Sequence, residues 1–150
     1  MPLPRPDLLN PIPGPNPSGE NLRYAPVYDK IKQARTEDAD TTLQGEWQRE
    51  RKKADWPTVL KLAGDALATK SKDLMLASWL GEALTKREGI SGLADALELQ
   101  RGLLEQFWDS LYPEKDEDGD LGLRVMPVEF LATRSRDLLR TIPLTKSGFD

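Results

Sequence analysis

The chain of 150 residues contains neither cysteine nor histidine. This excludes thiol nucleophiles, imidazole general bases, disulfide scaffolds and the usual zinc ligand sets. It also lacks a phosphate-binding glycine-rich motif, because the glycine pattern of a P-loop does not precede Lys70-Ser71. Carboxylates are plentiful, but nothing in the sequence selects a catalytic pair. We therefore predict a binding or assembly module rather than an enzyme, and no cofactor.

Long apolar runs and a basic surface are also missing. The longest nearly unbroken apolar stretch, Leu74 to Gly81, is far shorter than the roughly 18–20 residues that span a bilayer. The first residues, Met-Pro-Leu-Pro-Arg-Pro, differ from a signal peptide. Because nonspecific nucleic-acid binding requires a basic face to neutralise phosphates, we expect no nucleic-acid partner. We also expect no membrane insertion and a cytoplasmic location.

One loop accounts for the net charge of −4, since residues 114–120 contain five acidic residues and a single lysine. Clustered oxygens of this kind raise the question of a calcium site. If Glu114 is position 1 of a calcium loop, position 12 is Val125, where a bidentate glutamate is required. We therefore predict a solvated acidic loop and no metal site.

The sequence does contain strong helix signals. The most apolar stretch begins after Ser71, which we expect to cap a central helix, and ends near Gly89. Apolar residues at helical spacing predict four further helices, from Pro26 to Arg35, from Trp56 after the cap Asp55 to about Thr69, from Ser91 to Tyr112, and from Val125 or Pro127 to Thr141. No segment alternates like a strand. The prediction is all-α, an antiparallel bundle of about five to six helices.

Residues 1–22 contain seven of the twelve prolines, which prevents a persistent helix or central strand. We predict an extended proline-rich arm, followed by a helical domain over residues 23–142 and the beginning of a linker over 143–150. Apolar residues in the arm either strap it across the helices or dock it on a partner. The candidate partner-binding residues of the arm are Leu8, Leu9 and Ile12.

Trp47 lies within a strongly charged stretch, residues 46–53. A lone tryptophan among charges is a candidate contact residue, and the alternative is that its ring covers an edge of the core. We expect the other three tryptophans, Trp56, Trp79 and Trp108, to pack in the core, because each lies on an apolar helix stripe or at a helix start.

Several segments form an ordered set along nearly the whole chain. They include Leu8-Leu9-Asn10-Pro11-Ile12, Gly45-Glu46-Trp47, Lys53-Ala54-Asp55-Trp56, the stretch from Ser71 to Leu84, Phe107-Trp108-Asp109-Ser110-Leu111-Tyr112-Pro113-Glu114 and Pro143-Leu144-Thr145. Together they resemble the ImpA N-terminal domain family, which is found at the start of the TssA proteins of bacterial type VI secretion systems.

The resemblance implies a non-catalytic role in assembling a contractile tail machine, with baseplate, tube or sheath proteins as partners. It also implies that the full-length protein is homo-oligomeric through a C-terminal region absent from these 150 residues. The alternative is an unrelated helical adaptor or regulatory module, or an enzyme that uses carboxylates. A docking module should expose a contiguous apolar patch, whereas an enzyme should enclose carboxylates of perturbed pKa in a concave pocket.

Overall fold

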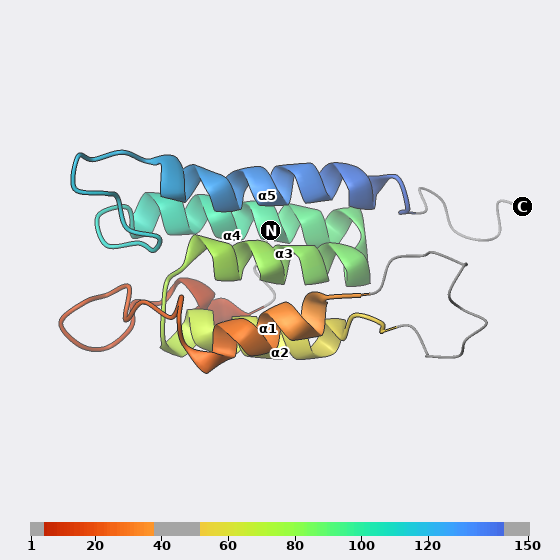
Figure 1. Cartoon of the computed structure of the whole chain (residues 1–150), viewed down its shortest axis with the longest axis horizontal. Coiled ribbons are helices and arrows are strands. Elements are labelled where there is room, and N and C mark those ends of the chain that lie inside the picture. Colours follow the sequence, from red (N-terminus) through yellow and green to blue (C-terminus); the bar gives the residue numbers. More distant parts are fainter. Residues whose placement is uncertain (1–4, 38–51, 143–150) are drawn as a thin grey trace, which may run out of the picture.

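The computed structural model describes residues 5–37 and 52–142, and the regular elements in these ranges are helices (Figure 1). Two isolated β-bridges are the only extended pairing among the described residues. The all-α prediction is therefore confirmed. The helices are η1 (Pro6–Leu9), α1 (Pro26–Arg35), α2 (Trp56–Thr69), α3 (Leu74–Glu88), α4 (Ile90–Gln106) and α5 (Gly122–Leu139).

Helix α3 is the centre of the bundle, since it contacts α1, α2, α4 and α5. Figure 1 shows α3, α4 and α5 running side by side, with α1 and α2 together on the other side of α3. Every residue of α3 from Leu76 to Thr85 is buried. The α1 and α5 backbones do not approach each other. These two helices therefore flank α3 and leave a seam between them.

The predicted bounds of α1 and α2 match the structure, and the beginning of α3 differs from the prediction. Asp55 caps α2 as expected, because its side chain accepts a hydrogen bond from the Thr58 amide. Helix α3 is capped by Asp73, whose carboxylate accepts from the amides of Met75 and Leu76. The expected cap, Ser71, instead lies in an isolated bridge with Gly19. Pairing with the N-terminal arm holds the backbone at Ser71 extended, so α3 begins later than predicted.

The arm packs on the bundle from residue 5 onward. Leu8 is fully buried and Ile12 is 7% exposed. The buried Lys72 ammonium donates hydrogen bonds to the carbonyls of Leu8 and Leu67, at 2.8 and 2.6 Å. Burial lowers the pKa of Lys72 to about 8. One lysine therefore ties the arm to the end of α2.

Two helix ends, both at the connection between α4 and α5, differ from the prediction. Helix α4 stops at Gln106 rather than Tyr112, and α5 begins at Gly122 rather than near Val125. The buried Arg124 guanidinium donates to the carbonyls of Trp108, Leu111 and Pro113, which replaces the helical hydrogen bonds of this turn. Contrary to the core placement expected for Trp108, this residue is 38% exposed, and Phe107 and Leu111 occupy the inward positions.

Candidate docking groove

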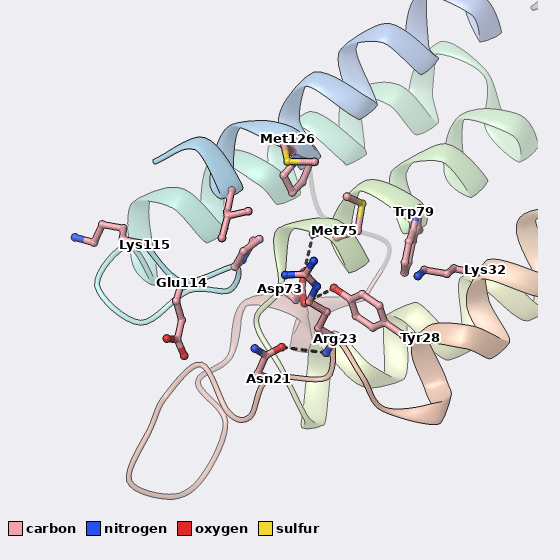
Figure 2. Close-up of a pocket in the computed structure, with 13 residues that line it drawn as sticks. Asn21, Arg23, Tyr28, Lys32, Asp73, Met75, Trp79, Glu114, Lys115 and Met126 are labelled. Carbon is pink, nitrogen blue, oxygen red and sulfur yellow. Dashed lines mark hydrogen bonds between the residues drawn. The ribbon is translucent and has the colours of Figure 1, made fainter. Parts of the chain in front are cut away.

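A cavity of about 430 Å³ opens between the beginning of α1, the first turns of α3 and the first turns of α5 (Figure 2). Helix α3 forms the floor of this cavity between α1 and α5. Its apolar lining comes from Met75 and Trp79 on α3 and from Leu123 and Met126 on α5. Three segments that are distant in the sequence thus line one cavity, and its apolar side chains come mainly from α3 and α5.

The floor of this groove is fixed by a buried polar contact. The Tyr28 hydroxyl donates to Asp73 Oδ2 at 2.5 Å, and Asp73 Oδ1 accepts from the Met75 amide at 2.7 Å. The Tyr28 ring meets the Trp79 ring edge-on, with centroids 5.0 Å apart. Burial raises the pKa of the Asp73 carboxyl, and burial together with the Asp73 charge raises the pKa of Tyr28. Both oxygens of Asp73 are therefore engaged in the fold.

The charged side chains of the groove are unevenly placed, with two cations in and before α1. Arg23 lies before α1, Lys32 lies on α1, Lys115 lies in the loop before α5, and the rim carboxylate is Glu114. Arg23 and Lys32 are exposed, and neither forms an ion pair with another residue in the described ranges. Arg23 instead lies 5.5 Å from the centre of the Tyr24 ring. The rim thus presents cations in a chain whose net charge is −4.

Apolar exposure continues along the first turns of α5. Met126 is 58% exposed, Val125 45%, and Leu123 42%. Met126 also borders a second, shallower hollow of about 380 Å³ on α5, which includes Phe130. Exposed apolar side chains that gather beside a cavity are typical of surfaces that bind partners.

At the other end of the seam, a charged triad joins α1 and α5 across α3. The carboxylate of Glu82 is fully buried and accepts from Arg35 Nε at 2.7 Å, from Arg35 Nη2 at 3.0 Å and from Arg134 Nε at 2.6 Å. The Arg35 guanidinium also lies 5.0 Å from the centre of the Phe130 ring. These contacts close the seam at one end, whereas the cavity leaves it open at the other.

Comparison with known proteins identifies the family. Residues 9–133 match the family described as ImpA, N-terminal, type VI secretion system. This chain belongs to the ImpA N-terminal family. The predicted resemblance is thereby confirmed.

Two relatives of this ImpA N-terminal domain are longer than this chain. It is 33% identical to the type VI secretion system component TssA1 of Pseudomonas aeruginosa, over 95% of this chain and 42% of that protein. A solved N-terminal domain of the TssA component from Burkholderia cenocepacia superposes with a TM-score of 0.79 and 39% identity, over 97% of this chain and 53% of the solved one. The chain thus spans about half or less of these relatives.

The candidate residues from the arm lie apart from the groove of this ImpA N-terminal domain. Leu8 and Ile12 are buried, and the half-buried Leu9 packs against Gly102 on α4. Trp47 falls outside the described residues, so its role remains a prediction. Sequence reasoning missed Met126 and Leu123. The available signal was that the apolar residues between 121 and 126 are too closely spaced to fit one helix face.

The acidic loop of the ImpA N-terminal domain is held by its own hydrogen bonds. Asp116 Oδ1 accepts from the amides of Asp118 and Asp120, at 2.9 and 2.7 Å. Across residues 5–37 and 52–142, no three acidic side chains are grouped so that they could hold a metal ion. None of the helices described is long and apolar enough to cross a membrane.

Proposed function

We propose that this ImpA N-terminal domain is a non-catalytic protein interaction domain of a TssA-like assembly factor. It docks through the groove on baseplate, tube or sheath components of the secretion system in the bacterial cytoplasm. The observation that carries this proposal is the exposed apolar surface of Leu123 and Met126 at the cavity. Apolar side chains left in water contribute nothing to the stability of an isolated domain, whereas a bound partner would bury them.

The carboxylates of the groove support docking over catalysis. Asp73 meets one criterion for the enzyme alternative, because it lines a concave pocket and its pKa is raised. Its oxygens, however, accept from the Tyr28 hydroxyl and from the α3 amides, so they act as a helix cap. The other lining carboxylate, Glu114, is exposed on the rim. This arrangement favours a structural role for Asp73 over a catalytic one.

The test is a binding assay with purified sheath, tube and baseplate proteins from the same bacterium and this chain as bait. Met126→Asp should abolish retention of one component, because it places a charge in the apolar surface. Leu97→Asp is the matched control, since Leu97 is 54% exposed on α4 and outside the groove. A Trp47→Ala variant tests the contact expected from the sequence. If the unmodified chain retains no tail component, the adaptor alternative takes precedence.

The role of the remaining part of the longer protein is also a proposal. We infer from the family resemblance that the full-length protein forms a homo-oligomer through a region beyond these 150 residues; TssA1, of which this chain spans 42%, is long enough to contain such a region. Light scattering on the full-length protein and on this chain would compare their masses. An oligomer formed equally by this chain alone would overturn the inference.

A further inference from the structure

We propose that the groove takes an acidic amphipathic helix of the partner. One bulky apolar side chain of this helix enters the cavity between Met75, Trp79 and Met126, and carboxylates beside it meet Arg23 and Lys32. The inference rests on the proposed docking function and adds the chemistry of the segment that is bound.

The apolar part of the proposal follows from the cavity. Its volume of about 430 Å³ is in the range of sites that enclose a small ligand, and is large enough for one or two large apolar side chains. Two methionines contribute to the lining, Met75 from the floor and Met126 from the wall. Methionine side chains are flexible and polarizable, and they adapt to an inserted side chain. The site therefore suits an anchor residue such as leucine or phenylalanine.

The acidic part follows from the charges around the opening. Lys32 and Arg23 form no ion pair with any residue in the described part of the chain, whereas Lys115 and Glu114 belong to the acidic loop 114–120. The Asp73 carboxylate is buried, where it accepts hydrogen bonds from Tyr28 and the α3 amides, and it is near enough to Arg23 for that cation to favour its ionised form. Lys32 is therefore the rim cation with the least compensation. A basic partner would meet this rim with like charges, whereas an acidic one complements it.

The shape of the groove favours a helix. Its floor is the straight helix α3, and its walls are α1 and α5, whose backbones do not approach each other. An amphipathic helix lies in such a groove with anchors three or four residues apart. The Glu82 triad fixes α1, α3 and α5 at one end of the seam. Near the cavity, the Tyr28–Asp73 contact fixes α1 on the start of α3, and the Ser78 hydroxyl on α3 donates to the Pro127 carbonyl of α5. The groove is thus preformed, which lowers the entropic cost of docking.

The test uses two synthetic peptides of roughly 15 residues with the same leucine and phenylalanine anchors at helical spacing, one with glutamate and the other with lysine at the remaining positions. Each is titrated into this chain and followed by two-dimensional NMR of the backbone amides. The acidic peptide should shift the amides around Lys32, Met75 and Met126. It should also bind at least tenfold more tightly than the basic peptide, and high salt should reduce that preference.

Charge reversal at the rim gives the second arm of the experiment. Lys32→Glu should weaken binding of the acidic peptide about tenfold. Lys30→Glu should leave it unchanged, because Lys30 is an exposed residue of α1 two positions away and does not line the cavity. Equal affinity for both peptides, shifts confined to other surfaces, no binding of either, or equal effects of the two reversals would each overturn the inference.

These outcomes can be distinguished from failure of the proposed function. If Met126→Asp abolishes retention of a tail component but this chain binds the acidic and basic peptides equally, the groove is the docking surface and the proposed preference for an acidic helix is wrong. If the acidic peptide binds as expected but no tail component is retained, the groove recognises an acidic helix that belongs to another kind of protein.

Discussion

The buried triad at the closed end of the seam leads to a quantitative prediction. Glu82→Gln removes the negative charge between Arg35 and Arg134, and leaves two guanidinium groups facing each other around one amide. The three hydrogen bonds that Glu82 accepts, at 2.6 to 3.0 Å, are all charge-assisted. Breaking a buried ion pair by removing one partner costs about 3–5 kcal/mol. We therefore expect a loss of about 3–5 kcal/mol in the free energy of unfolding.

The chain offers a matched control in Glu98, which pairs with Arg101 through two hydrogen bonds of 2.6 and 3.2 Å. The Arg101 side chain is 61% exposed, so Glu98→Gln should cost less than about 1 kcal/mol. The measurement is urea unfolding followed by circular dichroism, with the slope of each transition checked for equality. A loss below about 1 kcal/mol for Glu82→Gln, or equal losses for the two variants, would refute the reasoning that burial determines the cost.

Three further predictions concern buried contacts that stabilise the fold. Burial lowers the pKa of Lys72 to about 8. The Lys72 side chain therefore binds a proton more tightly in the unfolded chain than in the folded one, so the free energy of unfolding should rise by about 1 kcal/mol from pH 7 to 9. Lys72→Met should remove this increase in unfolding titrations. Asp73→Ala should destabilise the chain by about 1–2 kcal/mol more than Asp73→Asn, which keeps the α3 cap, in denaturant unfolding. Gly92→Ala should lower the melting temperature and Ser91→Ala should not, because a Cβ on Gly92 would lie 2.0 Å from the Leu84 carbonyl oxygen.

The sequence predicts those parts of the fold that depend on local signals. Pro26 and the Asp55-Trp56-Pro57 step define the starts of α1 and α2, because caps and first-turn prolines act within one turn of helix. The cap of α3 was misplaced for a non-local reason. Ser18 accepts from the Lys72 amide and Lys70 accepts from the Glu20 amide, so the arm holds these residues extended. No pattern within the α3 segment contains that information.

The groove could not be predicted because it depends on three distant segments. Lys32, Met75 and Met126 are each ordinary residues in their own helices, and only the packing of α1 and α5 on α3 brings them together. Glu82 did carry a sequence signal, since a glutamate within the apolar stretch Leu80 to Leu84 must find a partner when that stretch is buried. The identity of its two arginine partners again required the fold.

The placement of these contacts separates stability from binding. Glu82 and Asp73 are buried, and they fix how α1 and α5 sit on α3. Met126 and Lys32 are exposed at the opening and contribute little to the core. Variants at the opening should therefore change partner binding with less than about 0.5 kcal/mol effect on unfolding. Variants of the buried Glu82 and Asp73 should lower the free energy of unfolding, and they should affect binding only because the groove is then no longer preformed.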